Sequence, residues 1–178
     1  PIPSHLQAKD VLAKDYRPRD AIFAARDRCD ETVDRIRSVR TARFLYIRNF
    51  HPQRPWLQPN AYKDAKSILQ TLRRRHAAGE LTPLAEKLLF SPTRPPEELY
   101  EWTRDRWQVT NLASEPTHQA TLAALRSRLD WWMTETRDRG PESEAMYDSD
   151  MAVYLDGRDG NQDAITRRNI EQMKQWAR

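Results

Sequence analysis

The one cysteine in the chain, Cys29, is followed six positions later by Arg35 in the stretch Cys-Asp-Glu-Thr-Val-Asp-Arg. Cysteine phosphatases use a Cys-x5-Arg spacing to hold a phosphoryl group over a thiolate. Such a loop needs small residues whose backbone N–H groups converge on the anion, and a positive field around the sulfur. Here Asp30, Glu31 and Asp34 intervene and no glycine does, so the stretch would repel phosphate. We interpret Cys29 as a free thiol near a strand end.

The sequence also lacks a local metal site. The histidines, His5, His51, His76 and His118, are not spaced as a ligand pair. The stretch 156–163, Asp-Gly-Arg-Asp-Gly-Asn-Gln-Asp, lacks the alternating acidic positions and the terminal glutamate of an EF-hand loop. A single cysteine excludes an internal disulfide and a cysteine-rich zinc site. We therefore predict no metal ligand and no catalytic residue within this chain.

The charge pattern leaves two interpretations open. The 30 basic and 26 acidic residues give a net charge of +4, and arginine, which dominates the basic set, suits planar oxyanions. The two signs alternate closely, as in residues 25–37, which favours a solvated, salt-bridged surface. Three arginines in a row, residues 73–75, lie near a helix C-terminus, where the helix dipole favours cations. Since no nucleic-acid-binding signature accompanies them, we expect no nucleic acid partner, and keep a non-catalytic polyanion-binding module as the alternative.

The ends and the hydropathy of the chain carry further expectations. No run of eighteen apolar residues is present, so we predict no membrane span. The first ten residues, Pro-Ile-Pro-Ser-His-Leu-Gln-Ala-Lys-Asp, have no basic and apolar regions of a signal peptide. A chain that opens on Pro-Ile-Pro is interpreted as part of a longer protein.

The pattern of apolar residues predicts a small sheet with helices packed on it, an α+β unit. Strands are expected at 21–26, 34–41, 43–50 and 97–102, with a hairpin around Thr41-Ala42. Asn60 and Thr82-Pro83 are helix starts, and Gly79 ends the first of these helices. A longer helix is expected from about Ser114 to Gly140 on a leucine stripe, and a last one closes the chain.

Two segments in this order resemble the C-terminal portion of the sulfatase family, in particular its heparan N-sulfatase (sulfamidase)-like members. Residues 39–50 resemble that family's Arg-Thr-x-Arg-Tyr-Lys-Tyr-Ile strand pair. Residues 97–113 resemble its Glu-Leu-Tyr-Asp-x-x-x-Asp-Pro-x-Glu-x-x-Asn-Leu-Ala segment. The matching residues of the second segment are Glu98, Leu99, Tyr100, Asp105, Asn111, Leu112 and Ala113. The departures from the pattern are Leu45, Glu101, Arg106 and Gln108.

The resemblance, which covers about residues 15–178, implies a parent hydrolase of sulfate esters or sulfamates on a glycan. It implies a formylglycine nucleophile made from a Cys-x-Pro-Ser-Arg motif and an assisting calcium ion (Ca2+). Neither maps onto this chain, because Cys29 lacks that motif and the Asp-Asp and Asp-Asn calcium ligands are absent. The resemblance further implies a periplasmic or secreted parent, a sulfated glycan substrate, and the rest of the catalytic domain as partner.

The resemblance also suggests how the chain is divided and where substrate is contacted. It implies that residues 1–32 are the last strand and loop of an alkaline-phosphatase-like α/β catalytic domain. Residues 33–140 would form the C-terminal subdomain, and 141–178 an extension with a terminal helix. Such strand ends border active sites in α/β folds. The residues expected in the substrate-contacting loop are Arg26, Asp27, Arg28, Asp30 and Glu31.

Overall fold

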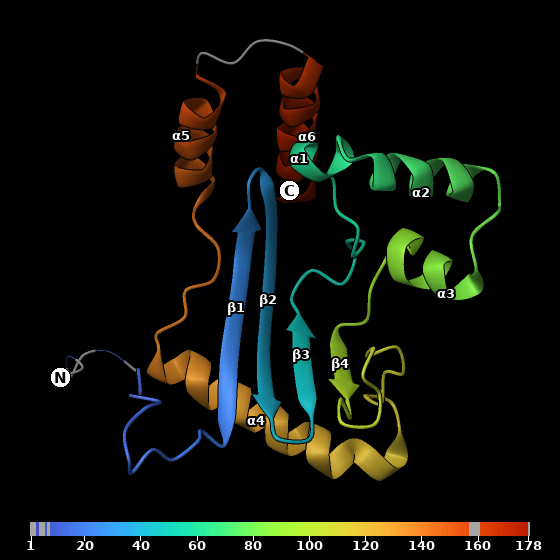
Figure 1. Cartoon of the computed structure of the whole chain (residues 1–178). Coiled ribbons are helices and arrows are strands. Elements are labelled where there is room, and N and C mark those ends of the chain that lie inside the picture. Colours follow the sequence, from blue (N-terminus) through green and yellow to red (C-terminus); the bar gives the residue numbers. More distant parts are fainter. Residues whose placement is uncertain (1–2, 4–5, 7, 157–160, 178) are drawn as a thin grey trace.

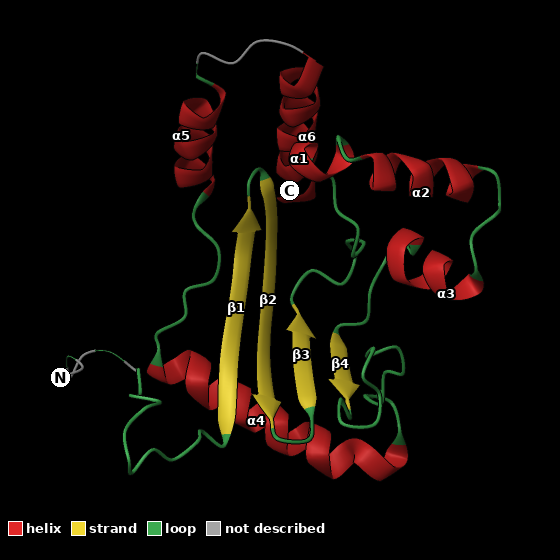
Figure 2. Cartoon of the chain, in the orientation of Figure 1, coloured by secondary structure: helices red, strands yellow, loops and turns green. Residues whose placement is uncertain are grey.

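The structure, a computed structural model, describes residues 3, 6, 8–156 and 161–177. Its centre is an antiparallel sheet of four strands in the order β1-β2-β3-β4. The strands are β1 (Ala21–Cys29), β2 (Thr32–Thr41), β3 (Leu45–Asn49) and β4 (Glu97–Tyr100). Figure 2 shows the four strands in yellow side by side, with the helices in red around them. The expected α+β class with a small antiparallel sheet is confirmed.

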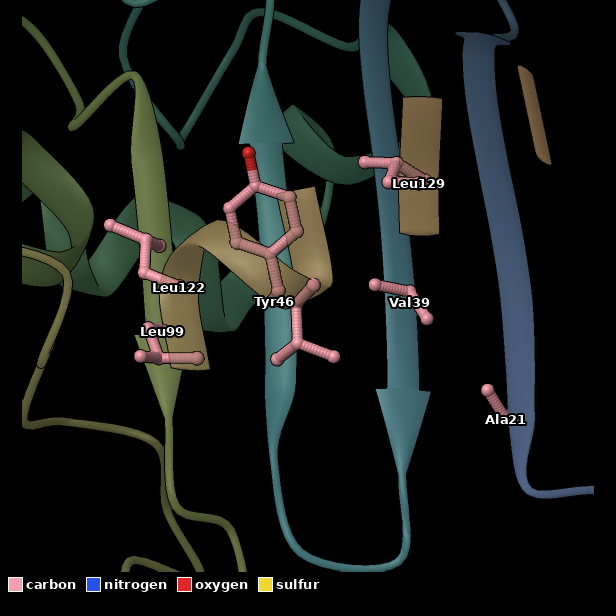
Figure 3. Close-up of a cluster of buried hydrophobic side chains, with 7 residues drawn as sticks. Ala21, Val39, Tyr46, Leu99, Leu122 and Leu129 are labelled. Carbon is pink, nitrogen blue, oxygen red and sulfur yellow. The ribbon is translucent and has the colours of Figure 1, made fainter. Parts of the chain in front are cut away.

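One helix supplies the apolar core against the sheet. The helix α4 (Gln119–Glu135) crosses behind the four strands at one end of the sheet (Figure 1). Its leucine stripe, Leu122, Leu125 and Leu129, is buried against Val39 and Tyr46 of the central strands (Figure 3). The predicted stripe is therefore confirmed, because leucines three and four positions apart share one helix face.

The helix boundaries predicted from capping residues hold in part. Asn60 caps α1 (Ala61–Asp64) and accepts from the Lys63 N–H, but a break separates α1 from α2 (Ser67–Ala77). Thr82 caps α3 (Pro83–Ala85), which continues as a π-helical turn over Glu86–Phe90. The long helix begins after a 3-10 turn at Pro116–His118, later than Ser114, and ends at Glu135, before Gly140.

Gly140 has another role. Its φ is +78°, and a Cβ at this position would lie 2.9 Å from Arg35 Nε. The glycine therefore lets the chain pass closely over a strand side chain, which any larger residue would obstruct.

Two helices stand beyond the other end of the sheet, around the tip of the β1–β2 hairpin (Figure 1). They are α5 (Glu144–Leu155), which the sequence did not predict, and α6 (Asn161–Ala177), the expected last helix. Tyr147 and Met151 of α5 pack with Ile170 and Met173 of α6 in a second apolar cluster. The described residues thus form two apolar clusters, one near each end of the β1–β2 hairpin (Figure 1).

The predicted substrate loop is instead a hairpin turn. Cys29 pairs with Thr32 across the strands, so only Asp30 and Glu31 lie in the turn, and Asp30 has a φ of 52°. The loop prediction was wrong because the alternating charges of this stretch concealed a strand period of two. The expected domain boundary at residue 32 falls within this hairpin, whose strands share one sheet. How the parent protein divides stays a prediction.

Candidate functional site

The tip of the β1–β2 hairpin carries the predicted substrate residues, and internal contacts hold most of them. Glu31 is fully buried, and its Oε1 accepts from the Ala61 N–H (2.6 Å) and the Asn169 amide (2.8 Å). The Tyr147 hydroxyl donates to the Glu31 carbonyl oxygen at 2.7 Å. Glu31 therefore joins the turn to helices α1, α5 and α6.

The neighbouring charges have partners in other segments. Arg28 pairs with Glu142 (2.8 Å) and with Asp150 of α5 (2.7 Å). Asp30 is exposed and accepts from the Asn60 amide at 3.1 Å. Arg28 is thus directed to α5 and the segment before it, whereas Asp30 and Glu31 are directed to the start of α1.

Arg37 forms a buried ion-pair centre on β2. Its guanidinium is 1% exposed and donates to both carboxylate oxygens of Asp138 (2.6 and 2.7 Å). It also donates to both oxygens of Asp27, at 2.7 and 3.0 Å. Bidentate pairs of this kind fix geometry as well as energy. Arg37 on β2 thus links Asp27 on β1 with Asp138, which follows α4 in the chain.

A second buried centre surrounds Asp34, a fully buried carboxylate. Arg94 donates to both of its oxygens, and the Gln58 amide donates to one of them at 2.8 Å. Burial acts to raise the pKa of Asp34, but the hydrogen bonds and charge of Arg94 outweigh it and hold that pKa below its ordinary value. The centre joins β2 to the proline-rich segment 51–60 and to the approach to β4.

The sequence pattern indicated that the interleaved charges of residues 25–37 form a solvated surface. In the structure, three of these charged residues are instead buried. Glu31, Asp34 and Arg37 are each at most 1% exposed. Their partners lie at Asn169, Arg94 and Asp138, far along the chain. The local sequence gives no signal for such pairs, since each is made by the tertiary fold.

Acid is expected to weaken the protein through these pairs. Hydrogen bonds from Arg37 hold the pKa of Asp138 at about 2, against an ordinary value of 3.8. A carboxyl group with a lowered folded-state pKa contributes stability that is complete above the unfolded-state pKa. That stability is lost as pH falls through about 4 towards 2. Urea unfolding is measured at pH 6, 4 and 2.5. The urea concentration at the unfolding midpoint should be lower at pH 2.5 than at pH 4 and 6, and an unchanged midpoint would contradict the assignment.

The segment that carries the second family-like pattern has a structural role. Asn111 Oδ1 accepts from the backbone N–H groups of Leu99 and Ala113, at 2.9 and 3.0 Å. Its amide donates to the Glu97 carbonyl oxygen at 3.1 Å. The Asp105 carboxylate accepts from the Thr110 N–H at 2.8 Å. These contacts close the loop after β4 onto the strand, so this pattern specifies a fold feature.

Several chemical interpretations of the sequence can now be placed. Cys29 is a free, half-buried cysteine at the end of β1. In the described part of the chain, no three His, Cys, Asp or Glu side chains are grouped to hold a metal ion. Residues 157–160 of the stretch compared with an EF-hand lie outside the described residues. The arginine run is partly paired, Arg73 with Asp64 and Arg75 with Glu80. No helix among the described residues is long and apolar enough to cross a membrane.

Comparison with known proteins gives sequence relatives of one kind. The chain is 38% identical over 130 residues to an ulvan-active sulfatase of Formosa agariphila, a match that covers 72% of this chain and 22% of the relative. It is 29% identical over 138 residues to the human N-sulphoglucosamine sulphohydrolase, covering 75% of this chain and 27% of the relative. No family model matches the chain.

The fold comparison is weaker. A solved 2-O GAG sulfatase aligns with a TM-score of 0.48 and 17% identity, over 78% of this chain and 22% of that one. The sequence relatives therefore carry the similarity, and they confirm the resemblance to sulfatases. The chain spans about a quarter of the length of the curated relatives it matches, which fits a C-terminal portion.

Proposed function

We propose that this sulfatase-like chain is the C-terminal portion of an enzyme that hydrolyses sulfate esters or sulfamates on a glycan. The observation that carries the proposal is the 38% identity to an ulvan-active sulfatase over 130 residues. Both curated relatives act, by their names, on sulfated saccharides. Because the match covers about a quarter of each, the nucleophile and the Ca2+ ligands of the parent belong in this proposal to the remaining polypeptide.

The chain's own contribution is to support the active-site wall and the substrate. Of the five predicted contact residues, Arg26 and Asp30 are the best suited to direct contact. Asp30 is exposed, and the Arg26 side chain makes no hydrogen bond or ion pair with the described residues. An arginine at this position suits the sulfate or carboxylate of a glycan. In the same proposal Asp27, Arg28 and Glu31 hold the hairpin tip that presents these two.

The remaining polypeptide of the parent is the proposed partner. Among the described residues, helices cover one face of the β1 end of the sheet and leave the other uncovered (Figure 1). Side chains alternate along β1, so Ile22 is on the face opposite Ala21; Ile22 is 56% exposed, whereas Ala21, packed with the leucines of α4, is 7% exposed. β1 is also an edge strand of the sheet, and the backbone groups of an edge strand can pair with further polypeptide. The parent is proposed to be periplasmic or secreted, as the family resemblance implies.

Activity measurements test the proposal. The purified 178-residue chain should release no sulfate from sulfated glycans or from an aryl sulfate above the uncatalysed rate. The parent protein should release sulfate, and the parent with Arg26→Ala should show a raised KM while its unfolding midpoint is unchanged. Ile68→Ala, an exposed position on α2, is the matched control. Sulfate release by the isolated chain would overturn the assignment of the nucleophile to the rest of the parent.

A further inference from the structure

A cavity of about 210 Å³ lies where the hairpin, the segment after β3 and helices α5 and α6 meet. Val33, Tyr147 and Met173 contribute apolar wall. His51 and Arg54 come from the segment after β3, and Lys174 and Trp176 come from α6. Ligand sites for drug-sized molecules are about 300–1,000 Å³, so this smaller cavity suits a single sugar ring or a substituent of one.

Arg54 is the unusual residue of this cavity. It is 3% exposed, and its two terminal nitrogens donate to the carbonyl oxygens of Val33 (2.9 Å) and Trp176 (3.0 Å). Its Nε is buried and has no hydrogen-bond partner. No carboxylate among the described residues lies within ion-pair distance of it. A buried guanidinium with an unpartnered Nε and no ion-pair partner among the described residues is costly, which points to an anion bound from outside them.

The neighbouring charges do not meet this need. Asp34 is the nearest buried carboxylate, and Arg94 already occupies both of its oxygens. Burial and, less strongly, the charge of Arg54 lower the pKa of His51 and so favour its neutral ring. That neutral ring makes no hydrogen bond with the described residues and is available to a ligand.

The charged residues around the cavity are largely matched with one another. Lys174 pairs with Asp148 at 2.7 Å, and Glu142 pairs with Arg28 at 2.8 Å. Glu144, at the exposed start of α5, is the remaining carboxylate of the lining. Its charge opposes an anion, so its removal should strengthen anion binding. Asp34, which is already bonded to Arg94, attracts Arg54, but Arg54 has no ion-pair partner of its own among the described residues.

We propose that this cavity is an accessory site for an acidic saccharide, with Arg54 attracting the oxyanion and Trp176 contacting the sugar ring. The guanidinium carbon of Arg54 lies 5.5 Å from the Trp176 ring centroid, so charge and aromatic surface adjoin. The oxyanion is a sulfate or a carboxylate, which share the geometry that arginine binds. The saccharide class rests on the proposed function, whereas the anion site rests on the cavity and Arg54.

Binding to the 178-residue chain tests this site without any turnover. Amide and indole NMR signals are followed during separate titrations with sodium sulfate, methyl glucuronide and neutral methyl glucoside, at ionic strength matched with sodium chloride. Saturable shifts are expected at Val33, Met173 and the Trp176 indole with sulfate, glucuronide or both. Arg54→Gln, which removes the charge, should weaken binding about tenfold or more.

A second variant guards against misfolding of the first. Glu144→Gln changes an exposed residue and should tighten anion binding about two- to threefold, since it removes a like charge at the rim. Glu115→Gln, also exposed but at the residue before the 3-10 turn that leads into α4, should leave the affinity unchanged. Sulfate binding alone identifies a sulfate site and glucuronide binding alone a carboxylate site. Absence of saturable shifts with both anions, or equal binding of the neutral glucoside, would overturn the proposal, while the sulfatase assignment would stand.

Discussion

Replacing Asp34 by alanine is expected to lower the free energy of unfolding by about 3–5 kcal/mol, because it leaves the Arg94 guanidinium buried without its counter-charge. Asp34 and Arg94 are 0% and 4% exposed, and the pair is bidentate. The Gln58 amide loses its acceptor in the same change. Urea unfolding followed by tryptophan fluorescence measures the loss.

An exposed ion pair provides the control for this prediction. Asp130 is 54% exposed and pairs with Arg48 at 2.5 Å. Asp130→Ala should cost no more than about 1 kcal/mol, since exposed pairs contribute little. Equal losses in the Asp34 and Asp130 variants would show that burial of the Asp34–Arg94 pair is unimportant.

The second large effect is expected for Arg37→Ala, at about 3–5 kcal/mol. The substitution removes four donor contacts to two carboxylates and leaves Asp27 and Asp138 facing each other without a cation. Thermal or urea unfolding at pH 6 measures the cost. Arg128→Ala, which breaks a surface pair with the 83% exposed Asp20, is the matched control and should change little.

The same variant should also alter the response to acid. Without Arg37 the pKa of Asp138 returns towards its ordinary value. The variant therefore lacks, at every pH, the stability that the unmutated chain loses below pH 4. The difference in unfolding free energy between the two proteins should therefore shrink between pH 4 and pH 2. A constant difference over that range would contradict the role given to the Arg37–Asp138 pair.

Local signals in the sequence predicted much of the secondary structure. The Asn60 and Thr82 caps and the leucine stripe of α4 act within one helical turn, so their physics is local. The charged positions could not be placed in this way. Arg37 and Asp34 looked like surface residues, because their partners are about 100 and 60 positions away.

The helix α5 shows a second limit of local patterns. Its buried residues Tyr147 and Met151 form a narrow stripe that packs against α6, so this helix depends on a partner that local patterns do not reveal. The prediction of the site residues was limited for the same reason. The sequence indicated the hairpin tip, but only the structure distinguished its exposed residue Asp30 from its buried residue Glu31.

The coding sequence upstream of Pro1 tests the central claim most directly. Sequencing the coding DNA upstream of Pro1 should reveal an in-frame Cys-x-Pro-Ser-Arg or Ser-x-Pro-Ser-Arg motif, preceded by an Asp-Asp pair. That result would supply the nucleophile and the calcium ligands that the family resemblance implies and make this chain the C-terminal portion of a sulfatase. A start codon immediately before Pro1 would contradict the account and favour a free-standing polyanion-binding module.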